Sequence, residues 1–505
     1  MANGDLILGI DLGTSACKAL LADTNVRVLA IGSACCPTHQ PRPGWAEQDP
    51  EEVWRCMLDA VREALQRAGV DRERIGAVSF SAAMHGLLPL NAAGRPLMRC
   101  LIWADRRSQP QAARLQSELD AHGVYLRTGC PVQPLYWPSK WLWLQEQQPE
   151  IARATRTLST IKDYVLQRLL GRVVCDVSNA SGTGLLNTHS LTWDEPLLEA
   201  VHVAPQQLPE LVLPETVLGV PCPGSADELG LPRGVQVVAG GADGGLANLG
   251  AGCVRAGQAV TSLGTSGAVR AITARPCLDS QERSWCYALT RDLWFVGGAI
   301  SNAGSVYSWL HDQLGLAGSA EEAFRQLDAW ASQVPPGAEG LVFLPLLLGE
   351  RSLGWRANAR GVLFGLAAHH TRKHVVRAAI EGVALRLYTV LRVLEDLQGS
   401  VSDMRVTGGL ATSPVWVKTV ADVYGRQVGV PRVQESSALG AVFVALKALG
   451  RIRDYSEVEA LASSERMQEP DPTNHELYLR LSEFSKRLYE QSLPLFDELQ
   501  QLCGR

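Results

Sequence analysis

The sequence predicts an α/β fold built from two halves of similar design. Short apolar segments that are typical of strands alternate with amphipathic helical segments, which is the pattern of α/β architecture. The tetrapeptide Leu-Gly-Thr-Ser occurs at 12–15 and again at 263–266 of the 505 residues. Both copies end one short apolar segment and precede another, so each half is expected to present the same strand–turn–strand hairpin.

Composition excludes several classes of protein. Hydrophobic residues make up 46% and charged residues 20%, which is ordinary for a globular chain and unlike a disordered or fibrous one. The net charge is −5, from 47 basic and 52 acidic side chains that are spread along the chain. Without a basic patch, nucleic acids and membranes are not expected partners. The chain contains no run of about 18 or more predominantly apolar residues, so no transmembrane helix is predicted.

The cysteines and the first residues bear on the compartment. The 12 cysteines include no Cys-x-x-Cys pair and no Cys/His spacing that suits zinc, so thiols in a reducing compartment are expected. Residues 1–5 carry no basic side chain and lead directly into an apolar strand, unlike a secretory signal. We therefore expect a cytoplasmic protein.

The first hundred residues contain a regular series of elements. Strands are expected at 6–12, 17–22, 26–32 and 75–80. A helix lies between the last two of these, with Asp49 as its N-cap, Pro50 as its first residue and Gly69 as its stop. Apolar residues at helical spacing between Val53 and Leu65 give this helix one buried face.

A long connection and a second series of strands follow. Residues 203–234 contain six prolines and little periodicity, which predicts a surface connection near a domain boundary. Further strands are expected at 235–240, 259–263 and 268–273. Residues 474–501 predict an amphipathic helix that is interrupted at Pro494, and Trp54, Trp309 and Trp330 are expected in the core.

The two Gly-Thr-Ser turns suit a phosphate ligand. Small residues leave backbone N–H groups and hydroxyls exposed, which makes a concave set of hydrogen-bond donors, although either turn alone is compatible with a plain hairpin. Asp11 precedes the first turn, and a carboxylate beside bound phosphate requires a cation between them. Mg²⁺ is the hard cation that one carboxylate, phosphates and water usually hold. The second turn has Ser262 at the matching place, so the two halves are expected to differ in function.

Two further glycine clusters follow strands. Asp243 lies within Gly-Gly-Ala-Asp-Gly-Gly at 240–245, where it could cap the next helix or act as a general base with room for a substrate. Thr-Gly-Gly-Leu at 407–410 leads into a helix capped by Ser413, which suits the α-phosphate or adenosine of a nucleotide. The chain has neither a Gly-x-x-x-x-Gly-Lys-Ser/Thr loop nor a Gly-x-Gly-x-x-Gly sequence, so P-loop and Rossmann dinucleotide sites are not predicted.

These motifs together resemble the FGGY family of carbohydrate kinases. The hairpin at 11–15 resembles the family's first phosphate motif, 262–267 its second, and 407–413 its adenosine motif. Gly361–Leu366, followed after seven residues by His374–Glu381, is similar to the C-terminal signature along its whole length. Lys140–Leu144 resembles the core of the N-terminal signature. The likeness extends from about Leu8 to about Gly450.

The resemblance implies two ribonuclease-H-like domains of the actin/hexokinase type around a central ATP/sugar cleft. Residues 1–244 would form the N-terminal domain, 245–455 the C-terminal domain and 456–505 a helical tail. The cofactors would be ATP and Mg²⁺, with Asp11 helping to hold the metal and Asp243 taking the proton from the attacking hydroxyl. A homodimer is left open.

The resemblance also implies which residues contact the two substrates. The expected nucleotide-binding residues are Gly13, Thr14, Ser15, Gly264, Thr265, Ser266, Asn302, Gly408, Gly409, Ala411 and Ser413. The expected sugar-binding residues are Met84, His85, Trp103, Asp105, Arg106, Lys140 and Asp243.

Within the family, several segments are closer to gluconokinases than to xylulokinases, so D-gluconate is the expected substrate and D-xylulose the alternative. The segments are 176–185, 286–290 and 297–304. Gluconate is an anion and favours a cation at its carboxylate, for which Arg106, Lys140 and Arg351 are candidates. Two other classes stay open: an actin-like ATPase without sugar kinase activity, and a regulatory sugar-binding protein without turnover.

Overall fold

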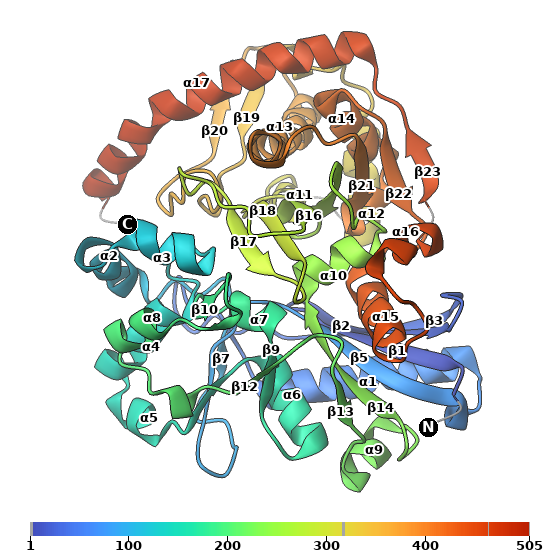
Figure 1. Cartoon of the computed structure of the whole chain (residues 1–505). Helices are drawn as coiled ribbons and strands as arrows, with labels where there is room; N and C mark the ends of the chain where they lie inside the picture. Colours follow the sequence, from blue (N-terminus) through green and yellow to red (C-terminus); the bar gives the residue numbers. More distant parts are fainter. Residues whose placement is uncertain (1–3, 316–318, 463, 504–505) are drawn as a thin grey trace.

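The computed structural model describes residues 4–315, 319–462 and 464–503, and it consists of two α/β units. In Figure 1 the first half of the chain, from blue to green, forms the lower unit, and most of the second half forms the upper unit. The division into 1–244, 245–455 and 456–505 stays a prediction, and its outermost residues, 1–3 and 504–505, lie outside the described residues.

The lower unit is built on a six-stranded mixed sheet in the order β13-β14-β5-β1-β2-β3. Its strands are β1 (Leu6–Leu12), β2 (Ala16–Asp23), β3 (Val28–Cys35), β5 (Ile75–Ala82), β13 (Val217–Gly219) and β14 (Gln236–Ala242). Strand β1 pairs antiparallel with β2 and parallel with β5, and β5 pairs parallel with β14. The three parallel strands therefore end at one edge of the sheet.

The upper unit repeats this design in a seven-stranded sheet, in the order β17-β18-β16-β15-β21-β22-β23. Its strands are β15 (Gln258–Leu263), β16 (Gly267–Thr273), β17 (Trp285–Ala288), β18 (Trp294–Ile300), β21 (Asp403–Thr407), β22 (Val428–Pro431) and β23 (Ser464–Gln468). Strand β15 pairs antiparallel with β16 and parallel with β21, as β1 does with β2 and β5. The repeat predicted from the two tetrapeptides is confirmed.

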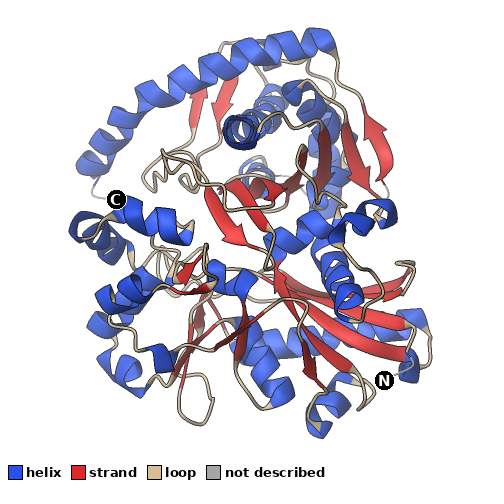
Figure 2. Cartoon of the chain, viewed as in Figure 1, coloured by secondary structure: helices blue, strands red, loops and turns tan. Residues whose placement is uncertain are grey.

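Helices cover both sheets, as Figure 2 shows. The helices of the first half are α1 (Pro50–Ala68), α2 (Gln109–Glu118), α3 (Ala121–Thr128), α4 (Trp137–Gln147), α5 (Pro149–Ala154), α6 (Ile161–Leu170), α7 (Val177–Ser181), α8 (Glu195–Ala200), α9 (Pro223–Leu229) and α10 (Asp243–Gly250). Those of the second half are α11 (Gly304–Gln313), α12 (Ala320–Ala331), α13 (Arg372–Gln398), α14 (Pro414–Tyr424), α15 (Ser436–Ala448), α16 (Val458–Leu461) and α17 (Pro472–Cys503). None of the helices described is long and apolar enough to cross a membrane.

Short strand pairs complete the fold. They are β4 (Glu47–Gln48) with β7 (Cys100–Leu101), β6 (Leu88–Leu90) with β8 (Thr157–Ser159), β9 (Val174–Asp176) with β12 (Glu210–Val212), β10 (Leu186–Asn187) with β11 (Thr192–Trp193), and β19 (Val342–Leu344) with β20 (Val362–Phe364). Helix α1 begins as predicted: the Asp49 side chain accepts from the backbone N–H groups of Glu51 and Glu52, and Gly69 ends the helix at a φ of 59°.

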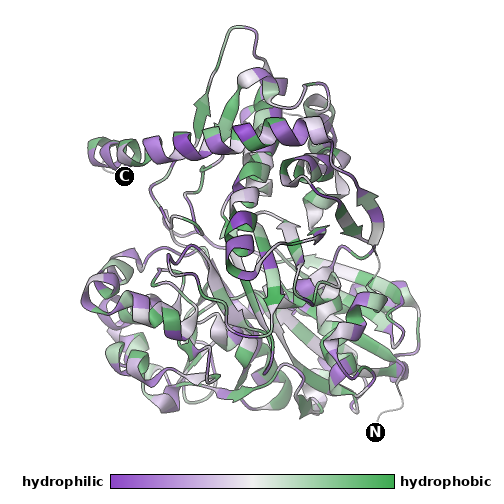
Figure 3. Cartoon of the chain, turned by 45° about the horizontal axis from the view of Figure 1, so that its top comes forward, coloured by the Kyte–Doolittle hydropathy of each residue, from purple (hydrophilic) through white to green (hydrophobic). Residues whose placement is uncertain are grey.

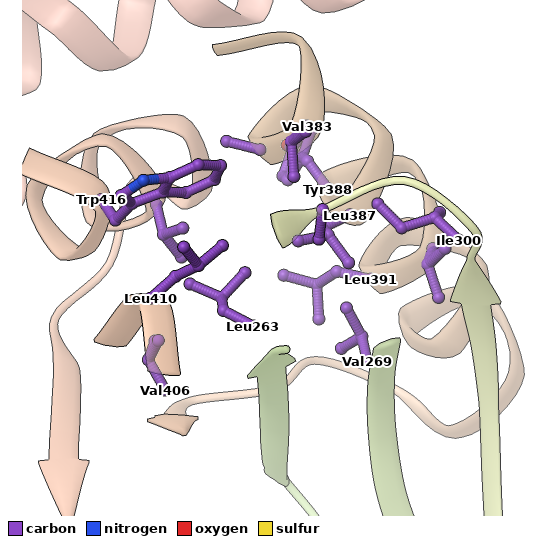
Figure 4. Packing of buried hydrophobic residues seen from close by; sticks show 14 of the residues in the cluster. Leu263, Val269, Ile300, Val383, Leu387, Tyr388, Leu391, Val406, Leu410 and Trp416 are labelled. Atoms are coloured by element: carbon purple, nitrogen blue, oxygen red, sulfur yellow. The ribbon is translucent and has the colours of Figure 1, made fainter. Parts of the chain in front are cut away.

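The core of the upper unit lies between its sheet and α13. Figure 4 shows Leu263, Val269 and Ile300 from β15, β16 and β18 packed against Leu387 and Leu391 of α13. These side chains are nearly or fully buried, so the hairpin of the second tetrapeptide is anchored on a close-packed layer.

Two helices join the units. Helix α15 comes late in the chain but packs on the lower sheet, where a Cβ on Gly9 would lie 2.2 Å from the Ala438 carbonyl oxygen. Helix α10 packs on α15 just as closely, because a Cβ on Gly440 would lie 2.0 Å from the Leu246 carbonyl oxygen. Glycine at these positions lets the backbones of the two units approach each other.

Four predictions about elements need correction. Residues 203–234, predicted to be a surface connection, contain β12, β13 and α9. The six prolines are compatible with these elements, since Pro223 is the first residue of α9 and the other five lie outside the strands. Helix α17 runs through Pro494 without interruption; the residue four positions earlier, Glu490, is exposed, which leaves water available to its carbonyl. In Figure 3 the ribbon of this helix is coloured largely as hydrophilic residues, with hydrophobic residues interspersed.

The other two corrections concern the tail and one tryptophan. Residues 456–505 are not wholly helical, since β23 adds an antiparallel edge strand beside β22. Trp309 is 37% exposed and not part of the core, because it lies at the edge of the face of α11 that Val306 and Leu310 bury. Its ring stacks instead on Phe343, with ring centroids 6.2 Å apart.

Candidate active site

A cavity of about 480 Å³ lies between the two units, and both hairpins line it. The predicted site residues that line it are Asp11, Thr14, Ser15, Met84, His85, Trp103, Asp243, Gly264, Thr265, Ser266, Gly408 and Gly409. Sheet topology brings them together. Strands β14, β5 and β1 are parallel neighbours, so Asp243, the 84–85 segment and Asp11 meet at the same carboxyl edge. In the upper sheet Ser262 pairs with Thr407, which sets the second hairpin beside Gly408.

Asp11 is held near the end of β1. Its Oδ1 accepts a hydrogen bond of 2.7 Å from the Ser81 hydroxyl of the neighbouring strand. Burial raises the pKa of Asp11 to about 6, and the negative charge of Asp243 adds to the effect. Lys18 lies opposite Asp11 in the β1–β2 register, but its ammonium pairs with Glu435 at 2.5 Å.

Asp243 is the first residue of α10. The backbone N–H of Gly244 donates to its Oδ1 at 2.7 Å, which fixes the carboxylate at the helix N-terminus. Burial raises the pKa of Asp243, while the nearby charges of Arg270 and Arg351 lower it. Among the described residues no side chain donates to this carboxylate, so it can accept a proton from a ligand hydroxyl.

The second hairpin is closed by backbone contacts. Gly264 donates to the Ser266 carbonyl at 3.1 Å, and the first residues of α11 donate to the carbonyls of Gly264 and Thr265. Gly408 has a φ of 93°, and a Cβ there would lie 2.5 Å from the Leu263 carbonyl oxygen, so only glycine fits. The predicted phosphate and adenosine motifs are thus in direct contact.

The predicted sugar and phosphate motifs also touch. The Trp103 indole N–H donates to the Thr14 hydroxyl at 3.0 Å. The Arg351 guanidinium lies 4.7 Å from the centre of the Trp103 ring, a cation–π distance. Burial lowers the pKa of His85 to about 3, so its imidazole is neutral, and its Nδ1 lies 2.6 Å from the Gly182 carbonyl oxygen. Nδ1 must then carry the proton, which leaves Nε2 as a hydrogen-bond acceptor.

Several predicted residues do not line this cavity. They are Gly13, Asp105, Arg106, Lys140, Asn302, Ala411 and Ser413. Ser413 caps α14, as expected, and accepts from the Trp416 N–H at 3.3 Å. Asn302 bonds the loop after β19, donating to the Gly349 carbonyl at 3.0 Å and accepting from the Leu348 N–H at 2.9 Å. Their direct contact with nucleotide stays a prediction.

The polar atoms of two expected sugar ligands, Asp105 and Lys140, are already engaged within the protein. The Asp105 carboxylate accepts from Arg107 and from the Ala46 N–H at 2.7 Å. The Lys140 ammonium is fully buried and donates to the carbonyls of His85, Leu101 and Ile102 at 2.7, 3.1 and 3.0 Å. Lys140 therefore ties the 84–85 segment to the strand that leads to Trp103.

Arg106 lies outside the central cavity but lines an adjoining cavity of about 560 Å³. Its guanidinium donates to the Leu348 carbonyl at 2.5 Å, which links the lower unit to a loop of the upper unit. Trp103 and Arg351 line both cavities, so the two cavities share a wall.

Other residues that line the cavity were not predicted from the sequence. They include Lys18, Tyr136, Arg270, Tyr287 and Glu435. Arg270 could have been singled out from the sequence, because it is the one charged residue in the otherwise apolar segment 268–272. The Tyr136 and Tyr287 hydroxyls, 2.6 Å apart, come from segments 151 residues apart, so no local pattern could reveal them.

The site can be tested for a fit to Mg²⁺. The described residues hold no cluster of three or more His, Cys, Asp or Glu side chains suited to a metal ion. Mg²⁺ usually needs only one or two carboxylates together with phosphate oxygens and water. Asp11 and Asp243 face one cavity beside two phosphate-type turns, and this donor set fits an ion that arrives with a nucleotide.

Comparisons with known proteins agree with this geometry. Residues 6–250 match the N-terminal domain, and 259–449 the C-terminal domain, of the FGGY family of carbohydrate kinases. The chain is 36% identical over 505 residues to gluconokinase of Bacillus subtilis (strain 168), covering 98% of this chain and 96% of that one. Gluconate kinase from Lactobacillus acidophilus has a similar structure, with a TM-score of 0.87, 30% identity and 98% of each chain covered.

A ligand-bound xylulose kinase from the same organism is equally similar in fold. Its TM-score is 0.88 at 30% identity, with 99% of this chain and 98% of that one covered. The predicted two-domain α/β fold of the actin/hexokinase type is confirmed by these structures.

Proposed function

The chain belongs to the FGGY family of carbohydrate kinases, and we propose that it transfers the γ-phosphoryl group of MgATP to a hydroxyl of D-gluconate. The observation that carries this proposal is the single cavity that two phosphate-type hairpins share with the Asp243 carboxylate. A kinase of this family uses ATP, and the cavity offers donors for its phosphates on one side and an acceptor for a hydroxyl proton on the other.

The proposed reaction assigns a task to each side of the cavity. The turns at Thr14–Ser15 and Gly264–Ser266 hold the phosphates through backbone N–H groups and hydroxyls. Asp243 orients the attacking hydroxyl and accepts its proton. Mg²⁺, bound through Asp11 and phosphate oxygens, would neutralise the charge that develops on the phosphates.

The sugar end of the cavity supports an anionic substrate. Of the three cations considered for the gluconate carboxylate, Lys140 is occupied by carbonyls and Arg106 lies outside the central cavity. Arg351 lines the cavity above Trp103, its Nε has no hydrogen-bond partner, and it pairs with no carboxylate within the described ranges. We infer that Arg351 faces the carboxylate of the substrate.

D-xylulose is the second candidate. The xylulose kinase from Lactobacillus acidophilus matches the fold as well as the gluconate kinase does. We also propose a cytoplasmic location, because the substrate is ATP and the 12 cysteines are all free thiols in this structure. A homodimer remains part of the proposal.

The test is a coupled ADP-release assay with MgATP and D-gluconate, D-xylulose, L-ribulose, glycerol or no sugar. We expect the highest kcat/KM with gluconate and D-xylulose next. Asp243→Asn should lower kcat by about 100-fold or more while ADP binding is kept. Asp292→Asn, at an exposed position in the turn after β17, is the matched control and should leave kcat unchanged. ADP release that is equal with and without every sugar would overturn the proposal in favour of an ATPase.

A further inference from the structure

Arg270 is a cation at the reacting centre that the proposed chemistry has not yet used. It lies on β16 and lines the central cavity, on the same strand face as Ala268. Its Nη2 donates to the Ser262 hydroxyl at 2.7 Å, while its buried Nε has no hydrogen-bond partner in the described part of the chain. No carboxylate among those residues forms an ion pair with it.

The position of the guanidinium is fixed by close packing. A Cβ on Gly244 would lie 3.4 Å from Cδ of Arg270, and a Cβ on Gly297 would lie 2.9 Å from its Cγ. The side chain therefore passes between two glycines and is held over the start of α10. The Asn248 amide also donates to the Arg270 carbonyl at 3.1 Å, which ties β16 to α10.

These contacts place Arg270 between the nucleotide and sugar sides of the cavity. Its partner Ser262 is the residue two positions before Gly264, in the second phosphate-type hairpin, and Ser262 also contacts the Thr407 hydroxyl at 3.1 Å. On its other side the Nε of Arg270 would lie 3.6 Å from a Cβ on Gly244, the residue after Asp243, and the charge of Arg270 lowers the pKa of the Asp243 carboxyl. The guanidinium therefore lies between the second hairpin and the start of α10, where Asp243 is the first residue.

The charge balance of the cavity also points to an anion here. The other cations that line it are Lys18, which pairs with Glu435, and Arg351, which lies over Trp103. A guanidinium withdrawn from water without a paired carboxylate is costly, and phosphoryl or carboxylate oxygens are the anionic ligands that its planar set of donors fits. The hydrogen bond to Ser262, beside the second phosphate-type turn, favours the phosphoryl group for Arg270.

We propose that Arg270 is a catalytic residue that contacts the γ-phosphoryl group during its transfer and stabilises the charge on its equatorial oxygens. In this step the sugar oxygen forms a bond to phosphorus, and the bond from phosphorus to the bridging oxygen of ATP breaks. The electron pair leaves with ADP, and the hydroxyl proton moves to Asp243. The assignment rests on the proposed kinase reaction, and it adds a residue whose contribution is specific to the transition state.

A different role would be that Arg270 acts only through Asp243, by lowering the pKa of that carboxyl. The two roles differ in their kinetic signature. Loss of a transition-state contact lowers kcat at every pH, whereas loss of a charge that tunes Asp243 moves the acid limb of the pH profile upward and leaves the plateau intact.

The test compares Arg270→Gln and Arg270→Lys with the wild type, and with Arg275→Gln as a matched control at an exposed position just after β16. We measure kcat and both KM values with MgATP and D-gluconate across pH, and the binding of MgADP with aluminium fluoride and gluconate. For Arg270→Gln we expect the plateau kcat to fall about 1,000-fold, in the range of a lost catalytic arginine, with KM values nearly unchanged. Aluminium fluoride should no longer tighten MgADP binding. Arg270→Lys should lose less, and the control nothing.

A plateau kcat within about tenfold of the wild type, or a loss confined to the acid limb, would overturn the assignment. Melting temperatures and MgADP affinity show whether Arg270→Gln folds; if it does not, Arg270→Lys decides by the same two readouts. If the wild type phosphorylates gluconate and both Arg270 variants have the same kcat as the wild type, only the role of Arg270 is refuted. A wild type without sugar-dependent ADP release refutes the kinase reaction, and with it this assignment.

Discussion

The hydrogen bond between Trp103 and Thr14 makes a sharp prediction, because it joins the expected sugar site to the first phosphate hairpin. Trp103→Phe keeps an aromatic ring beneath Arg351 but removes the N–H that donates to the Thr14 hydroxyl at 3.0 Å. Thr14→Val removes the acceptor and keeps the shape of the side chain. Each change therefore breaks the same bond from a different side.

The magnitudes follow from the contacts that each variant loses. A typical hydrogen bond contributes about 1 kcal/mol net, which corresponds to about a fivefold loss of kcat/KM for Trp103→Phe. Trp103→Leu also loses the cation–π contact of Arg351, about 2 kcal/mol in a desolvated site, so its kcat/KM should fall about 100-fold. Thr14→Val should lose at least as much as Trp103→Phe, since Thr14 also lines the nucleotide side of the cavity.

The assay is a double-mutant cycle on kcat/KM with MgATP and D-gluconate. If the two side chains act through their shared bond, the double variant should be about 1 kcal/mol better than the sum of the single effects. Effects that add to within about 0.3 kcal/mol would refute the coupling of the two sites. Trp309→Phe is the matched control, because Trp309 is 37% exposed on α11 and should leave kcat/KM unchanged.

Three further predictions concern pH and stability. Burial raises the pKa of Asp243 and raises that of Asp11 to about 6. Because both groups act as carboxylates, kcat/KM should fall as the pH drops through about 6 and the carboxylates take up protons. A fall of kcat/KM that begins only near about pH 4 would contradict this prediction. His85 has a pKa of about 3 and is neutral at working pH, so His85→Gln should lower kcat/KM without moving either limb of the pH profile; a shifted limb would show that His85 titrates. The Tyr478 hydroxyl of α17 donates to the buried Glu381 carboxylate at 2.8 Å, so Tyr478→Phe should lower the free energy of unfolding by about 1.5–3 kcal/mol in urea. A change below about 0.5 kcal/mol would mean that this bond does not anchor the tail.

Local chemistry made the hairpins and the first helix predictable. The repeated tetrapeptide marks the ends of β1 and β15, which occupy equivalent places in the two sheets. Asp49, Pro50 and Gly69 mark the limits of α1 because capping depends on the side chains at the helix ends. Asp243 could be singled out because it follows a buried strand among glycines.

Long-range packing explains what the sequence did not reveal. Helix α15 packs on β1 and β5, which lie more than 350 residues earlier in the chain, and the close approach uses glycines that leave no periodic signal. Lys140 was expected to bind sugar because its type suits an anion, but three backbone carbonyls surround its ammonium. Such carbonyls are invisible in a sequence. Arg270 differs from Lys140, because its side chain lines the cavity and forms no ion pair with a carboxylate in the described structure.

The central claim is that a phosphoryl group moves from ATP to a sugar acid with Asp243 as the base, and phosphorus NMR of the reaction mixture tests it most directly. With MgATP and D-gluconate, the wild type should produce a phosphomonoester signal that grows in step with ADP, and Asp243→Asn should produce almost none. Release of inorganic phosphate in step with ADP, without a phosphomonoester, would contradict the account.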